Sequence, residues 1–177
     1  MNRLEIERYT LGSDREHGYL VWDPATLDSI LIDIAAASEL ELRNIEGFIA
    51  RHNMRSVQRV DTRQALAKGF VIRVGNLHFE VIELGEEGFE HFALYEADAK
   101  CMFVGDVVYN CHIDKEILND THKRDLLRDV LDRIFSLPDD VMLYPAHGEP
   151  LTVRRLRLIY HEHVENCMIC KMLEIYG

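Results

Sequence analysis

Residues 101 to 109 read CMFVGDVVY, an apolar run that reaches Gly105-Asp106 and leaves a carboxylate at the tip of a predicted buried strand. A similar arrangement follows in residues 141 to 148, VMLYPAHG, where an apolar strand runs into His147. Each strand therefore presents one side chain that can bind a metal ion or move a proton. Because functional residues concentrate on loops that a rigid scaffold positions, Asp106 and His147 mark the first candidate site.

The composition is that of one globular domain. The chain has 177 residues, 47% hydrophobic and 29% charged, which is enough for a single domain over residues 1–177. A formal net charge of −11 leaves no basic surplus for phosphates, so we expect no nucleic-acid or membrane partner. Without a signal peptide or an apolar run of about 20 residues, and with four cysteines, we expect a cytoplasmic protein with reduced thiols. The GxSxG, P-loop and GxGxxG motifs are absent as well, so serine hydrolysis and nucleotide binding through those loops have no support.

The hydrophobic periodicity predicts strands and helices in an α+β order. Alternating runs predict strands, and longer runs with period 3.6 predict helices, the first of them capped by Ser38. Gly75-Asn76 predicts a hairpin turn. We therefore expect two mainly antiparallel sheets with helices outside. The predicted strands are 4–10, 19–22, 30–34, 56–60, 70–74, 77–82, 91–95, 101–104 and 141–144, and the predicted helices are 39–52, 63–68, 121–136 and a last one from 153.

Four stretches together resemble the metallo-β-lactamase fold, and the most similar branch is that of glyoxalase II and the persulfide dioxygenases. They are residues 19–33, 71–83, 103–109 and 133–148, the last of which has helix, LPDD turn, strand and PAHG loop in the family's order. The resemblance implies a shortened αββα sandwich. It also implies one or two metal ions, held by an HxHxDH loop, a histidine in a PGHT-like loop, an aspartate and a final histidine. Several such ligands converge because a hydrolytic metal must be held while one position stays open for water.

The family's ligand set is incomplete in this chain. By the resemblance, Asp106 matches the bridging aspartate and His147 the final histidine, while Glu86 stands where the PGHT-type histidine would be. Arg63 and Ala65 stand where the first two histidines would be. Relative to the family, a segment is missing before the predicted strand that begins at residue 70. We expect Arg63 to lie near Asp106 and replace the charge of the metal with an ion pair.

Two functions remain open from these residues. The first is a binding or regulatory pseudoenzyme without a cofactor, in which His147 would hydrogen-bond Asp106 and the surface exposed by the missing segment would be covered in a homo-oligomer. The alternative is a single-metal hydrolase of the thioesterase or glyoxalase II type, or a persulfide dioxygenase-like enzyme. It would use Asp106, His147 and Glu86 around one Zn, Fe or Mn ion.

The C-terminal region contains a second cluster of metal-binding residue types. His161, His163, Cys167 and Cys170 form an HxH…CxxC pattern inside one predicted helix. His163, Cys167 and Cys170 share a face but span about 10 Å along the helix axis, which is too far for one ion bound at about 2.0–2.3 Å. We expect a packed helix face here, with a metal site shared between two chains as the alternative.

Overall fold

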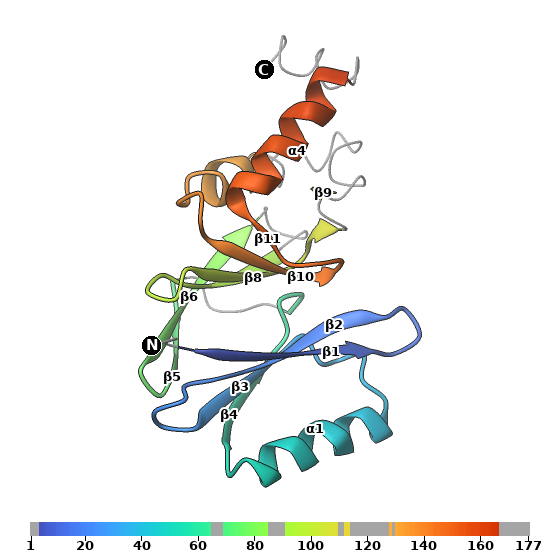
Figure 1. The fold of residues 1–177 in the computed structure, drawn as a ribbon, viewed down its shortest axis with the longest axis vertical. Helices are drawn as coiled ribbons and strands as arrows, with labels where there is room; N and C mark the ends of the chain where they lie inside the picture. The colour runs from blue at the N-terminus through green and yellow to red at the C-terminus, as the bar shows by residue number, and fades with distance from the viewer. Residues whose placement is uncertain are drawn as a thin grey trace.

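The computed structural model describes residues 4–64, 69–84, 91–109, 112–113, 128 and 130–166. They form four layers, helix, sheet, sheet and helix, as Figure 1 shows from α1 at the bottom to α4 at the top. The predicted αββα sandwich is therefore confirmed. Within the described ranges, no helix is long and apolar enough to cross a membrane.

The first sheet has the strand order β1-β2-β3-β4. Its strands β1, β2 and β3 form an antiparallel meander, and β4 pairs parallel to β3. Helix α1 covers the outer face, with Ile45 and Ile49 buried against the sheet. Ser38 begins this helix in a capping box with Glu41, in which each side chain accepts a bond from the other residue's N–H. The bounds are β1 Glu5–Leu11, β2 Glu16–Trp22, β3 Asp28–Ile32, β4 Arg55–Val60 and α1 Glu39–Arg51.

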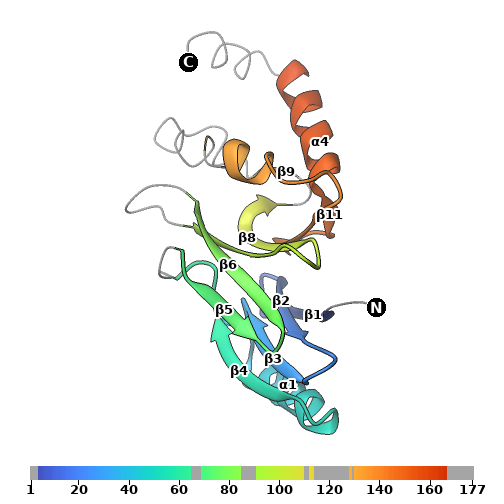
Figure 2. The ribbon, with the colours of Figure 1, turned by 90° about the vertical axis from the view of Figure 1, so that its left-hand side faces the viewer.

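The second sheet has the strand order β11-β10-β8-β7-β6-β5, with the short β9 paired to β8. Its neighbours are antiparallel except β10 and β8, which run parallel. The helix α4, Val153–Asn166, and a π-helical turn, Val130–Ile134, lie on its outer side (Figure 2). The strands are β5 Val71–Val74, β6 Leu77–Leu84, β7 His91–Glu96, β8 Cys101–Tyr109, β9 His112–Ile113, β10 Met142–His147 and β11 Leu151–Thr152.

Three apolar layers separate the four structural layers. Strand β8 shows why, because its side chains alternate between two of them: Phe103 packs between the sheets, while Met102 and Val104 pack under α4 and the π-helical turn. The third layer, with Leu20 and Leu31, lies between the first sheet and α1. A chain of this length can therefore bury both faces of both central sheets.

Asp23 ties the two sheets together at the end away from Asp106. Its carboxylate is 2% exposed and accepts bonds from the backbone N–H and side-chain amide of Asn76, both at 2.8 Å. It also accepts the N–H of Ala25 at 2.8 Å and the hydroxyl of Thr26 at 3.2 Å. The β2–β3 turn of one sheet is thus fastened to the β5–β6 turn of the other.

Several predicted elements differ in length or pairing from those observed. Strand β8 continues to Tyr109 and β10 to His147, because each gains ladder bonds from the other that local sequence cannot reveal. The short strands β9 and β11 were not predicted. Of the predicted helix 121–136, the described part contains the π-helical turn at its end; the rest lies outside the described residues.

Candidate active site

A β-bulge in β8 aims Asp106. The register between β8 and β10 shifts twice, from Tyr144 opposite Phe103 to Pro145 opposite Gly105 and then to His147 opposite Tyr109. Gly105 has φ +55°, a left-handed conformation that glycine adopts without steric cost. Asp106 thus lies inside the strand, and not at its tip as predicted, but the bulge turns its side chain out of the regular alternation.

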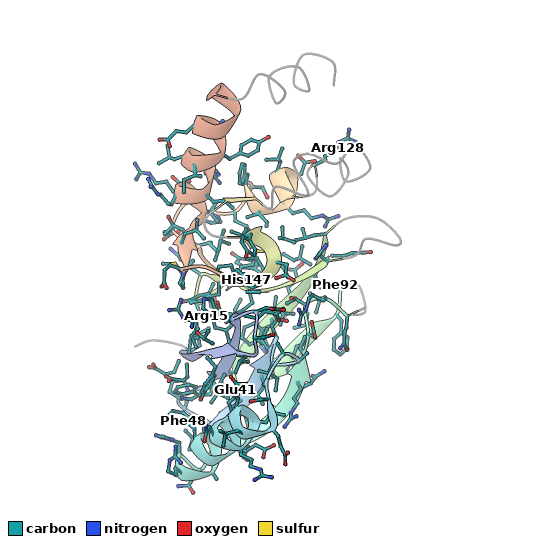
Figure 3. The ribbon with its side chains drawn as sticks, turned by 90° about the vertical axis from the view of Figure 1, so that its right-hand side faces the viewer. Arg15, Glu41, Phe48, Phe92, Arg128 and His147 are labelled. Carbon is teal, nitrogen blue, oxygen red and sulfur yellow. The ribbon has the colours of Figure 1, made fainter. Side chains whose placement is uncertain are left out.

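His147 comes from the last residue of β10. Figure 3 shows it near the boundary between the two sheets. Its ring lies 4.7 Å, centroid to centroid, from the ring of Tyr109 on β8. Two residues earlier, the carbonyl of Pro145 accepts a 2.5 Å bond from the buried hydroxyl of Tyr19 on β2. The end of β10 is therefore held by both sheets.

The structure brings Asp106 and His147 together without a hydrogen bond. The distance from His147 Nε2 to Asp106 Oδ1 is 3.8 Å, and the two side chains are 17% and 28% exposed. This distance is too long for a hydrogen bond, so that part of the prediction is wrong. Among the described residues, Asp106 Oδ1 is buried and has no hydrogen-bond partner. A buried carboxylate oxygen without a partner is costly, so this atom is suited to bind a cation.

Arg63 forms ion pairs with two other carboxylates instead of Asp106. Its Nη1 lies 3.0 Å from Oε2 of Glu16 on β2, and its Nε donates to Asp61 Oδ1 at 3.1 Å. The predicted direct pair with Asp106 is therefore wrong, because Glu16 and Asp61 lie closer to the guanidinium. Burial lowers the pKa of Arg63, whereas the bond and charge of Asp61 and the charge of Glu16 raise it. The charge of Asp106 adds to this, and the net pKa lies above the usual value.

Asp33 and Thr62 support the bulge from the other sheet. Asp33 follows β3 and is 3% exposed, and its carboxylate accepts bonds from the N–H and hydroxyl of Thr62 at 2.7 and 3.0 Å. Burial raises the pKa of Asp33 to about 7, although both bonds from Thr62 lower it. A Cβ at position 105 would lie 2.3 Å from the Thr62 hydroxyl oxygen. The sequence gave no sign of the pairing of Thr62 with Asp33, because the two are 29 positions apart.

The rim beside His147 is polar. Arg8 on β1 makes two bonds to Glu149, at 3.0 and 3.1 Å. His17 lies nearby, and burial lowers its pKa, with further lowering by the charges of Arg8 and His147. This histidine is therefore neutral at neutral pH. The sequence gave no reason to place Arg8, His17 and Glu149 at the site, since three separate segments supply them.

The remaining predicted ligands are not placed. Glu86, Cys167 and Cys170 lie outside the described residues, and of His163 only the backbone in α4 is described. Across the described ranges, no group of three or more histidine, cysteine, aspartate or glutamate side chains could hold a metal ion. The described residues thus supply two candidate ligands, Asp106 and His147.

These two ligands fit a metal ion only in part. The buried, unpartnered Asp106 Oδ1 is suited to a cation, and His147 Nε2 lies on the same side. A catalytic zinc site normally has three protein ligands and one open position. A third ligand is not among the described residues. The described residues therefore do not complete a metal centre.

A hollow of about 310 Å³ adjoins the site on the α1 side of the first sheet. Asp61 lines it, as do Arg59 and Gln64, and its apolar wall includes Ile34 and Leu42. Neither Asp106 nor His147 lines it. The hollow and the Asp106–His147 pair are therefore neighbouring features that share the segment after β4.

No family model matches the chain. In sequence, the chain is similar to a hydroxyacylglutathione hydrolase of Rhodopseudomonas palustris strain BisA53, with 26% identity over 174 positions that cover 81% of this chain. The chain spans 66% of the length of that relative. The alignment has more positions than the residues of this chain that it covers. Part of the relative's matched stretch therefore has no counterpart in this chain.

Solved structures show the similarity at the level of the fold. The ETHE1 protein of Myxococcus xanthus superposes with a TM-score of 0.71 at 16% identity, covering 85% of this chain and 80% of its own. TTHA1623, solved in a di-iron-bound form, superposes with a TM-score of 0.69 at 18% identity, covering 87% and 98%. The chain has the metallo-β-lactamase fold. Within that fold, it is similar to the glyoxalase II and ETHE1-like branch, as the sequence predicted.

Proposed function

We propose that this chain is a binding or regulatory protein built on the metallo-β-lactamase fold, without metal-dependent hydrolysis. Arg63 carries the proposal. By the resemblance it stands where the family has its first histidine ligand, and its guanidinium is engaged by Glu16 and Asp61. A guanidinium has no acceptor atom and cannot ligate a metal ion, so Arg63 does not replace that histidine as a ligand.

The ligand to be tested follows from the relative. The Rhodopseudomonas protein is a hydroxyacylglutathione hydrolase by name. We propose that this chain binds a hydroxyacylglutathione, or another small molecule, without cleaving it. Native mass spectrometry of the purified full chain would detect such a bound molecule. Asp106, His147 and the hollow beside Asp61 offer polar and apolar surface for such a ligand.

The test is the metal content of the full chain, purified without chelator or affinity tag and measured by elemental mass spectrometry. Asp106→Asn is the test variant and Asp14→Asn, on an exposed turn, is the matched control. We expect far less than one ion per chain in all three proteins and no hydrolysis of a hydroxyacylglutathione after addition of Zn, Fe or Mn. About one ion per chain, lost in Asp106→Asn and kept in Asp14→Asn, would overturn the proposal.

One observation favours a second candidate, a single-metal hydrolase. Asp106 Oδ1 is buried without a partner among the described residues and lies 3.8 Å from His147 Nε2, as two ligands of one ion would. Glu86 is then the proposed third ligand. Hydrolysis that needs an added metal ion and is lost in Asp106→Asn, His147→Ala and Glu86→Gln would establish this candidate.

A further inference from the structure

Strand β5 forms one edge of the larger sheet. The strand order of the described residues ends at β5, and Figure 2 shows β5 beside β6 at the margin of the sheet. Two consecutive apolar residues lie there in the open, Phe70 with 54% and Val71 with 41% of its surface exposed. An open strand edge with exposed apolar side chains is a template for pairing with another chain.

The backbone groups that face away from β6 can be identified. The Val81 N–H donates to the Phe70 carbonyl at 3.0 Å, and the register continues with Val71 opposite Glu80. In an antiparallel pair, hydrogen-bonded and non-hydrogen-bonded residues alternate. The N–H and C=O groups of Ile72 therefore face β6, and those of Val71 and Arg73 point outward from the sheet.

The other edges of the two sheets are better protected. On β4, Arg55 pairs with Asp28 and Arg59 pairs with Glu46, which places exposed charges along that edge. Strand β1 carries exposed charged residues along its length, and β11 is two residues long. Charges and short length are the common means of blocking edge pairing. Strand β5 has one charged residue, Arg73.

The exposed face of the β5–β6 hairpin has a charge pattern that can match itself. Val71, Arg73, His78 and Glu80 all point to this face, and each is exposed. Arg73 Nη1 lies 2.7 Å from His78 Nε2, on the neighbouring strand. Glu80 lies opposite Val71 and forms no ion pair with any other described residue.

We propose that β5 pairs antiparallel with β5 of a second copy of this chain, about a two-fold axis at Ile72. Val71 then lies opposite the partner's Arg73, and the outward N–H and C=O groups of both residues pair. The larger sheets of the two copies become one continuous sheet. The dimer surface on β5 does not depend on the proposed function of the site around Asp106 and His147.

The two-fold axis decides which charges meet. The partner's Arg73 lies beside Val71, and Val71 lies beside Glu80, so the arginine side chain reaches across one valine to that carboxylate. Symmetry makes this contact twice. Phe70 lies opposite Val74 of the partner subunit and loses part of its exposed surface. Registers that place Arg73 opposite Arg73 of the partner subunit are disfavoured, because like charges directly opposite destabilise a sheet.

The test is sedimentation equilibrium of the full chain over a concentration series that reaches about 100 μM, since a small interface gives a weak dimer. The variants are Arg73→Glu, Glu80→Arg and the double exchange. Each single variant places like charges across the axis twice. We therefore expect the dissociation constant of the dimer to be about tenfold higher than in the native chain. The double exchange restores the opposite charges and the dimer. Arg43→Glu, on the exposed face of α1, is the control with the same charge change and should leave the dimer unchanged.

The native chain sedimenting as a monomer across the whole series would overturn the proposal. So would a dimer that keeps its strength in both single variants, because the contact would then lie on another surface. A thermal melt of each variant shows that the monomer fold is intact, as expected for exposed positions.

Discussion

Replacing Gly105 by alanine tests whether the bulge that aims Asp106 depends on close packing against Thr62. The φ of Gly105 is +55°, and an added Cβ would lie 2.3 Å from the Thr62 hydroxyl oxygen and 3.2 Å from the Thr62 Cβ. Thr62 cannot turn away freely, since it is 1% exposed and its hydroxyl is bonded to Asp33. Gly105→Ala should therefore be accommodated only by moving β8 or the segment after β4.

The expected loss in free energy of unfolding has two parts. A left-handed alanine costs about 1–2 kcal/mol. Overpacking adds about 1–3 kcal/mol, and the reduced entropy of the unfolded chain returns about 0.4–1 kcal/mol. The net loss is about 1–5 kcal/mol, with a midpoint of about 3 kcal/mol. Gly69→Ala is the matched control, because Gly69 has φ +69° and no atom of the described residues within 4 Å of an added Cβ. It should cost about 1 kcal/mol or less.

The assay is urea unfolding followed by circular dichroism, with Thr62→Ala completing a double-mutant cycle. Gly105→Ala should cost at least about 1 kcal/mol less when the Thr62 hydroxyl is already absent. Equal losses for Gly105→Ala and Gly69→Ala, or an equal cost of Gly105→Ala in both backgrounds, would refute the packing argument.

Three further predictions concern stability. The folded pKa of Asp33, about 7, lies above the unfolded value of 3.8, so the folded state holds its proton longer and native stability falls as pH rises from about 4 to 7. This fall amounts to at most about 4 kcal/mol, and Asp33→Asn should remove it in urea melts at pH 4 and pH 7. An Asp33→Asn variant that loses as much stability between the two pH values as the native chain would contradict the assignment of the fall to Asp33. Asp23→Ala leaves buried donors at both turns and should cost about 3 kcal/mol, more than Asn76→Ala, and equal losses would count against its role in joining the sheets. Ser38→Ala should cost about 1 kcal/mol through loss of the capping box, and a thermal melt identical to the native one would show that the cap contributes nothing.

Much of the fold follows from local patterns. The alternation in residues 71–83 around Gly75-Asn76 predicts the β5–β6 hairpin, and Ser38 predicts the start of α1; both are confirmed. The order of helix, turn and strand before His147 predicts β10. These features are accessible because each depends on residues within a few positions of one another.

The site was predicted only in part. The sequence identified Asp106 and His147, and the structure brings them within 3.8 Å. It gave the wrong partner for Arg63, because Glu16 lies 47 positions away and competes with Asp106 for the guanidinium. The role of Glu86 and of the cysteines in the last helix stays a prediction, since those residues are not described.

The sequence alone determined most of the helices and strands, their order and the two candidate side chains Asp106 and His147, because backbone propensity and hydrophobic periodicity act locally. The tertiary structure decided the parallel pairing of β10 with β8, the bulge at Gly105 and the burial of Asp33 against Thr62. Each of these depends on contacts between strands far apart in the chain. Such contacts set the burial of a titratable side chain and the charges around it. Burial and charge in turn set its pKa and its ability to bind a ligand.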